Sequence, residues 1–400
     1  MARSWLPTWA WRSLPLCLAA IVTASCATTT VPTSTGPGAT DGSSPTRESS
    51  ATCAPDALAN MTEEQRVGQL FVLGIEGDHL SADERSTIET NHIGSTYLVN
   101  SRTGGVAGVR TLTSSIQALA TGANTDGVGF FVAADQEGGQ VQRLSGPGFD
   151  RIPSALVQGQ IPTATLQADA ATWGQELLAA GVNLDLGPVM DVVPPGSDAI
   201  NEPIGALQRE YGHDPTTVGD HGAAVVRGMA HAGVATTLKH FPGLGRVAGN
   251  TDTTAGVVDS ATTSNDAYLA AFETGIEAGA PLVMVSLATY ALIDPDHQAA
   301  FSSTIIQTLL RGRLGFKGVV VSDDLGATAA VSSLAPGIRA TEFIGAGGDL
   351  ILVGGVDPAA EMAAAVLSRA RSDTLFATQV DAAALQVLEA KANYGLLSCG

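Results

Sequence analysis

Between residues 56 and 397 the sequence alternates short apolar runs with longer segments whose apolar residues recur at helical spacing. The short runs are predicted strands: 94–99, 129–134, 182–186, 234–239, 281–286, 318–322 and 349–353. The longer segments are predicted helices: 61–73, 106–120, 165–180, 215–232, 265–278, 303–314, 358–371 and 380–394. Alternation of this kind predicts parallel strands that are joined by helical crossovers.

Seven or eight such units in about 340 residues indicate a single (β/α)8 TIM-like barrel of the α/β class rather than an open sheet. No second linker interrupts this span, so we expect one catalytic domain over residues 53–400. We expect the last two predicted helices to cover the exterior of the barrel.

The first 25 residues have the features of a bacterial export signal. Arg3 and Arg12 precede an apolar stretch at 14–22, which is too short for a stable membrane span. Thr23-Ala24-Ser25-Cys26 resembles a lipobox, with Thr23 in place of the usual leucine. We therefore expect Cys26 to be lipidated, and the protein to be anchored to the outer face of the cytoplasmic membrane. Secretion without a lipid is the alternative.

Residues 26–52 are rich in Thr, Ser, Gly and Pro and show no apolar periodicity, so they are predicted to be a disordered tether. Two cysteines then bracket the predicted domain, Cys53 at its start and Cys399 at its end. Exported proteins meet oxidising conditions, and Cys17 and Cys26 are used by cleavage and lipidation. We expect a Cys53–Cys399 disulfide, with two free thiols as the alternative.

The charge balance limits the classes of partner. The chain has 39 Asp and Glu against 20 Lys and Arg, for a formal net charge of -19, and no basic stripe. Such a surface repels phosphate backbones, so we exclude nucleic acid as a partner. The four cysteines are too widely spaced for a CxxC-type zinc site, and no metal is expected. Membrane contact is expected through the lipid anchor alone, and the protein is expected to be a monomer.

Polar residues gather where the predicted strands end. The clusters are Asp135 to Gly139, Asp185 with Asp191, Lys239 to Gly243, and Ser322 to Asp324. In a (β/α)8 barrel the carboxyl ends of the strands form the catalytic face, because the loops there converge on one mouth. Because all four clusters follow the carboxyl ends of predicted strands, they indicate an active site at that mouth.

Five segments carry a resemblance to a known family. They are ADQEGGQVQRL (134–144), NLDLGPVMDV (183–192), IGALQREYGHDP (204–215), TLKHFPGLG (237–245) and LGFKGVVVSDDLGATA (314–329). Together they resemble the NagZ-like β-N-acetylglucosaminidases of glycoside hydrolase family 3. The resemblance covers essentially the whole chain after the tether, and the KHFPG and SDD motifs are its most specific parts.

The resemblance implies roles for individual residues. The family's nucleophile is the aspartate after the serine of the SD motif, which is Asp323 here, and Asp324 then has a capping role. The residues at the family's substrate-binding positions are Asp135, Arg143, Arg209, Lys239 and His240. Asp135 would accept hydrogen bonds from sugar hydroxyls, while the four basic residues would donate. An ordinary salt bridge is the alternative for the two arginines. Glu137 is interpreted as structural.

The sequence departs from the family in the loop after KHFPG. NagZ-like enzymes usually carry Asp-Ser-His there, and the histidine is the acid/base; this chain has Asn250-Thr251-Asp252, and Leu244 replaces another usual histidine. We predict that Asp252 is the acid/base, which requires a pKa well above the ~3.9 of free aspartate. The alternatives are a polar loop residue, or acid catalysis by Glu210. An aspartate would repel inorganic phosphate, so hydrolysis is expected rather than phosphorolysis.

The predicted function is a retaining exo-β-N-acetylglucosaminidase that releases terminal β-linked GlcNAc from peptidoglycan-derived fragments in cell-wall turnover. A covalent glycosyl-aspartate intermediate is expected. The alternatives are a family 3 β-glucosidase and a weakly active sugar-binding envelope lipoprotein. No cofactor is implied, because two carboxylates suffice for this chemistry.

Overall fold

The structure, a computed structural model, describes the backbone of residues 47–398 and the side chains of residues 53–398. The predicted signal peptide, most of the predicted tether, Cys26 and Cys399 lie outside the described residues. The described residues, 47–398, belong to one compact unit. Cys53 is disulfide-bonded; its pairing with Cys399 stays a prediction.

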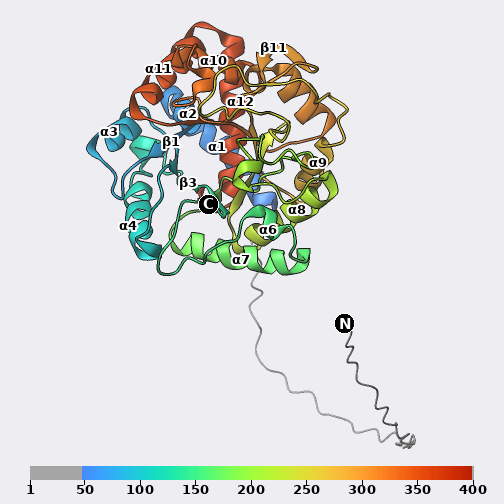
Figure 1. The fold of residues 1–400 in the computed structure, drawn as a ribbon. Coiled ribbons are helices and arrows are strands. Elements are labelled where there is room, and N and C mark those ends of the chain that lie inside the picture. Colours follow the sequence, from blue (N-terminus) through green and yellow to red (C-terminus); the bar gives the residue numbers. More distant parts are fainter. Residues whose placement is uncertain (1–46, 399–400) are drawn as a thin grey trace, which may run out of the picture. The chain divides into compact units, whose positions relative to one another are not determined.

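Eight parallel strands form a barrel, as the sequence predicts (Figure 1). They are β1 (Phe71–Ile75), β2 (Ser95–Leu98), β3 (Phe131–Ala134), β6 (Leu184–Asp185), β7 (Ala235–Phe241), β9 (Leu282–Val285), β12 (Val319–Ser322) and β13 (Ile351–Val353). The order in the sheet is β12-β9-β7-β6-β3-β2-β1-β13. A parallel bridge between Val321 and Leu350 joins the two outer strands.

The barrel strands are continuous apolar runs because both of their faces are covered. Every residue of β3, β9 and β12 is buried. Side chains alternate between two cores. Phe131 and Met284 belong to a cluster inside the barrel, whereas Val132 and Val283 belong to the larger cluster under the surrounding helices.

Helices surround the barrel, as Figure 1 shows. The longer ones are α3 (Ala82–Thr90), α4 (Gly105–Gln117), α7 (Thr163–Ala179), α8 (Pro215–Ala232), α9 (Leu269–Glu277), a π-helix at Thr304–Arg313, α10 (Pro336–Gly345) and α11 (Val356–Ser372). Helix α8 matches its predicted bounds because its end signals are strong. Asp214 caps its first turn through Oδ1, Pro215 is its first residue, and Gly233 ends it in the left-handed conformation.

The predicted helix at 61–73 is wrong at its end, where residues 71–73 belong to a strand. Helix α2 (Glu63–Gln69) begins with a capping box between Thr62 and Gln65 and ends before Phe71, where β1 begins. A short apolar run fits a buried strand as well as a buried helix segment, so periodicity alone did not separate the two. This run supplies the eighth strand of the barrel.

The expected position of the last helix is also wrong. Helix α12 (Thr374–Asn393) packs Val387 and Ala390 into the cluster inside the barrel, beside the first residues of several strands. The ring of Tyr394 lies edge-on to Phe131, 6.3 Å between centroids. Helix α12 therefore covers the amino-terminal opening of the barrel, whereas α11 packs against the outer core. The opposite opening is left for the loops after the strands.

Two small sheets, the remaining α-helices and three short 3-10 helices complete the described part of the fold. A hairpin is formed by β4 (Gln136–Gly138) and β5 (Val141–Gln142), and β8 (Val258–Asp259), β10 (Thr289–Tyr290) and β11 (Asp294–Gln298) form a three-stranded sheet. The other α-helices are α1 (Arg47–Asn60), α5 (Gly122–Thr125), α6 (Ala155–Gln158) and α2. Within residues 47–398, no helix has the length and apolar character needed to cross a membrane.

Candidate active site

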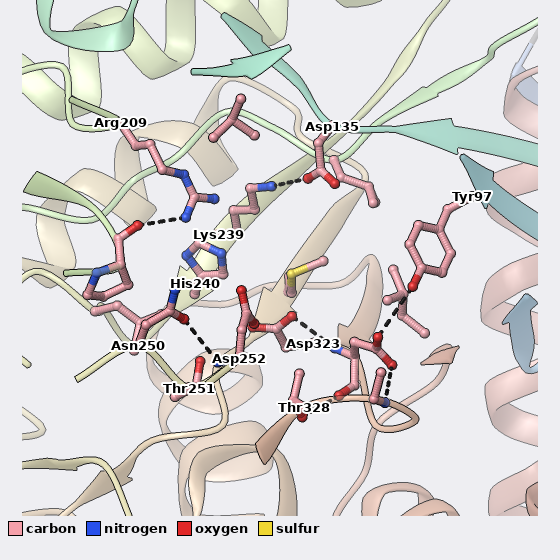
Figure 2. A pocket seen from close by; sticks show the side chains of 18 of the residues that line it. Tyr97, Asp135, Arg209, Lys239, His240, Asn250, Thr251, Asp252, Asp323 and Thr328 are labelled. Carbon is pink, nitrogen blue, oxygen red and sulfur yellow. Dashed lines mark hydrogen bonds and ion pairs between the residues drawn. The ribbon is translucent and has the colours of Figure 1, made fainter. Parts of the chain in front are cut away.

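A pocket of about 340 Å³ lies at the carboxyl ends of the barrel strands (Figure 2). All seven residues to which the sequence assigns a catalytic or sugar-binding role line it: Asp135, Arg143, Arg209, Lys239, His240, Asp252 and Asp323. They come from six different loops or strand ends, as is usual for a (β/α)8 barrel. Tyr97, Asn250, Thr328 and Leu244, among others, complete the wall.

Asp323 directly follows β12 and is held by the backbone on both sides. Its N–H donates to the carbonyl of Val285, 3.1 Å away, and its Oδ1 accepts the N–H of Asp324 at 2.8 Å. Burial raises the pKa of Asp323 to about 6, the charge of His240 opposes this, and the carboxylate of Asp252 adds to it. A fixed carboxylate at the tip of a buried strand suits a nucleophile.

Asp324 has a different set of contacts. Its Oδ1 accepts the N–H groups of Gly326 at 2.7 Å and Gly354 at 2.8 Å, and its Oδ2 lies 3.4 Å from the hydroxyl of Tyr97. These contacts organise the turn after β12 and agree with the predicted capping role. The two neighbouring acids are therefore not equivalent, because the Oδ1 of Asp324 is occupied by two backbone donors.

Four charged residues form a network on the opposite wall. Lys239 Nζ lies 2.6 Å from Asp135 Oδ1 and 2.7 Å from Glu137 Oε1. Arg209 donates to both oxygens of Glu137, at 2.7 and 2.8 Å, and to the carbonyl of Pro203 at 2.8 Å. Burial lowers the pKa of Lys239, but the charges of Asp135 and Glu137 outweigh it and hold the pKa above its ordinary value. Lys239 is therefore a cationic donor.

Glu137 is the part of this network whose function the sequence analysis missed. Burial alone would raise its pKa, but the charges of Arg209 and Lys239 outweigh burial and lower the pKa to about 2. The fully ionised carboxylate thus positions two sugar-binding candidates at once. In the sequence, Glu137 stands between Asp135 and two glycines, which gives no sign of a distant partner. Only the fold shows that Arg209, which is far along the chain, donates to its carboxylate. Arg209 therefore forms the salt bridge that was its alternative role, and its predicted sugar-binding role stays a prediction.

His240 is oriented by Asp191, which is completely buried. Asp191 Oδ2 lies 2.8 Å from His240 Nδ1, and Oδ1 accepts the N–H groups of His240 at 3.1 Å and Leu244 at 2.7 Å. A carboxylate against Nδ1 fixes the ring and its tautomer, so Nε2 is the nitrogen left for a ligand. The sequence placed Asp191 among the polar residues at the strand ends but assigned it no role.

Arg143 lines the pocket and has an unsatisfied hydrogen-bond donor. Its Nε is buried and has no hydrogen-bond partner among the described residues. Unpaired buried donors are costly, so this group is suited to an acceptor supplied by a ligand. The contacts favour the predicted sugar-binding role over the alternative salt bridge.

The loop with Asp252 is fixed to the segment that follows the nucleophile candidate. Asn250 Oδ1 accepts the N–H of Asp252 at 2.9 Å, and the carbonyls of Asp252 and Thr251 accept the N–H groups of Ala329 and Ala330 at 3.0 and 3.1 Å. Figure 2 shows the side chains of Asp252 and Asp323 next to each other below His240. The loop thus supplies a second carboxylate to the pocket.

Glu210, the alternative proton source, is oriented away from this pocket. Its side chain is fully buried and is not part of the pocket wall. Its carboxylate lies instead in a group with Asp198 and His213. Burial raises the pKa of Glu210 to about 7, but Glu210 is not among the residues that line the pocket.

Comparison with known proteins shows the family of the chain. The family model described as the glycosyl hydrolase family 3 N terminal domain matches residues 62–390. A β-hexosaminidase of Stenotrophomonas maltophilia R551-3 is 33% identical over 292 residues, which is 71% of this chain and 83% of the relative.

Solved structures show the same likeness. The β-N-acetylhexosaminidase of Beutenbergia cavernae has a TM-score of 0.81 and 51% identity, covering 83% of this chain and 98% of that one. A family 3 β-N-acetylglucosaminidase of Paenibacillus sp. FPU-7 has a TM-score of 0.76 and 30% identity over 84% and 63% of the two chains. LpqI of M. tuberculosis, with 24% identity and a TM-score of 0.72 over 84% and 95%, shows the same fold. From the barrel, the pocket and these matches, the chain belongs to glycoside hydrolase family 3.

Proposed function

We propose that this protein is a retaining exo-β-N-acetylglucosaminidase. It hydrolyses terminal β-linked GlcNAc from peptidoglycan-derived fragments through a covalent glycosyl-aspartate intermediate. The observation that carries the proposal is the pair Asp323 and Asp252 in one pocket, close enough for the charge of Asp252 to raise the pKa of Asp323. Two carboxylates around one glycosidic bond are what a retaining glycosidase needs.

The reaction follows from the positions of these two acids. Protonated Asp252 gives its proton to the glycosidic oxygen while Asp323 attacks the anomeric carbon, so the leaving alcohol departs and a glycosyl ester forms. Ionised Asp252 then takes a proton from water, whose oxygen attacks the same carbon and releases Asp323. Each acid ends in the state in which it began.

The opposite wall supplies sugar recognition. Asp135 accepts hydrogen bonds from ring hydroxyls, and Arg143, Arg209, Lys239 and His240 donate to sugar oxygens. These donors are held before substrate arrives, because Glu137 and Asp191 fix three of them. The choice of GlcNAc is supported by the names of the relatives, including the 51% identical β-N-acetylhexosaminidase of Beutenbergia cavernae.

The proposed cellular role depends on the predicted localisation of the protein. A lipid on Cys26 and a tether over residues 26–52 would hold a monomeric catalytic domain at the outer face of the cytoplasmic membrane, where cell-wall fragments are formed. The membrane would be contacted through the lipid alone.

An assay on the full-length protein tests the proposal. It should release the aryl group from an aryl β-GlcNAc at least tenfold faster than from the matching aryl β-glucoside, and Asp323→Ala should release neither. A preference for the glucoside would indicate a β-glucosidase. Sugar binding without release from either substrate would indicate a binding lipoprotein.

A further inference from the structure

Outside the sugar pocket, Asp198, Glu210 and His213 come together. One donor atom from each lies within 4.8 Å of the others. None of the three lines the sugar pocket. All three belong to the long connection between β6 and α8, Asp198 near its middle and Glu210 and His213 near its end. The connection therefore folds back so that its two parts meet at one point.

The carboxylates of this group lack partners. Both carboxylate oxygens of Glu210 and Oδ1 of Asp198 are buried and have no hydrogen-bond partner among the described residues. The Glu210 side chain is 0% exposed. No Lys or Arg of residues 53–398 forms an ion pair with either acid. Two buried carboxylates that lie together without a lysine or arginine are costly, so this arrangement needs a cation or a proton held between them.

The histidine completes a mixed set of ligand atoms. His213 Nδ1 lies 3.7 Å from Asp198 Oδ1. It also donates to the carbonyl of Val193 at 3.2 Å, a hydrogen bond that Nδ1 would give up if it bound an ion. Two carboxylates and one imidazole are ligands that Zn²⁺ and neighbouring divalent metals accept, at about 2.0–2.2 Å from the ion. Ligand atoms about 2.1 Å from a tetrahedral ion are about 3.4 Å apart, so donors that are up to 4.8 Å apart would approach one another by up to about 1.4 Å on binding the ion. Asp198 and His213 are partly exposed, so water can reach the remaining coordination positions.

We propose that Asp198, Glu210 and His213 form a binding site for a divalent first-row metal ion, with Zn²⁺ as the representative ion. The sequence argument against zinc considered cysteine ligands, and this set contains none. A bound ion would join the middle of the connection between β6 and α8 to its end at 210–213. Arg209, which precedes Glu210, lines the sugar pocket and also contacts Pro203 in the same connection. The ion would therefore stabilise the wall that carries Arg209.

Titration of the metal-free full-length protein with Zn²⁺ alone tests the site. We expect one Zn²⁺ per chain by calorimetry and by metal analysis after dialysis, together with a higher Tm. Glu210→Gln and His213→Gln should each lower the affinity more than about tenfold. Two variants are used so that a folding defect in one does not remove the test.

His297→Gln is the matched control. His297 Nδ1 also lies beside an aspartate, 3.1 Å from Asp294 Oδ1, but far outside this group. This control should bind Zn²⁺ as the unmodified protein does. The proposal is overturned if the unmodified protein takes up no stoichiometric Zn²⁺, because the two carboxylates then share a proton instead. It is also overturned if His213→Gln binds as well as His297→Gln, or if Ca²⁺ binds more tightly than Zn²⁺.

Discussion

Asp191 holds His240 at two points, with Oδ2 2.8 Å from the ring Nδ1 and Oδ1 3.1 Å from the backbone nitrogen of the same residue. The acid is completely buried, so its contacts cannot be replaced by water. A residue that lines the pocket is thus positioned by one that does not line it.

Asp191→Asn should therefore reduce turnover while the protein stays folded. An amide keeps the shape of the side chain but removes the charge and lets the histidine adopt the wrong tautomer. We expect kcat/KM to fall about 10–100-fold, as for other residues that orient a functional histidine. Asp259→Asn, at a buried acid that caps a turn outside the pocket, is the control. An equal loss of kcat/KM in both variants would argue for a purely structural role.

Asp323→Ala should abolish turnover, because it removes the covalent step. A fluorinated slow substrate followed by peptide mapping should label Asp323 in the unmodified protein. Label on Asp324 would contradict the assignment, which rests on the different contacts of the two acids.

The pH dependence of kcat/KM should follow the ionisation of Asp323. Burial raises its pKa to about 6, and only the ionised carboxylate is a nucleophile. On the acid side of the profile, the rate is therefore half-maximal near pH 6 and is lost as the pH falls through this value. Because the charge of Asp252 also raises this pKa, Asp252→Asn should move the acid limb of the profile to lower pH with an activated aryl substrate. If the acid limb of the Asp252→Asn profile lies at the same pH as that of the unmodified protein, the charge of Asp252 does not raise the pKa of Asp323.

Glu137→Gln should destabilise the protein, because it leaves Lys239 and Arg209 buried with less compensating charge. Removing one partner of a buried ion pair costs about 3–5 kcal/mol, measurable by urea unfolding. The pKa of Glu137 is about 2 in the folded protein and near its ordinary value when unfolded. Its stabilisation is present above pH 4.5 and is lost as the pH falls toward 2. The variant should therefore lose less stability than the unmodified protein over that range.

The sequence predicted the barrel because buried parallel strands leave a strong signal, seen in β9 and β12. It failed at β1 and α12, where an apolar run fits two structures and where only the closed barrel shows which opening a helix covers. The site residues also divide into those that a local sequence pattern identifies and those that only the fold brings together. Asp323 and Lys239 lie in specific motifs, whereas the contact between Arg209 and Glu137 joins residues that are distant in the sequence. Such contacts follow from the fold and have no local pattern.

The acid/base role of Asp252 is predicted at a position where the sequence departs from the family pattern. Substrates with good and poor leaving groups test this role directly. Asp252→Ala should slow glycosylation about 10²–10⁴-fold for substrates with poor leaving groups, which need protonation to depart. An activated aryl β-GlcNAc departs without much protonation, so its glycosylation should change far less. Azide should partly restore deglycosylation, because it attacks the glycosyl-enzyme without a base. If good and poor leaving groups slow equally and azide has no effect, Asp252 is not the acid/base. Since Glu210 does not reach the pocket, the proton would then come from another group on the wall, and His240 Nε2 is the first to test.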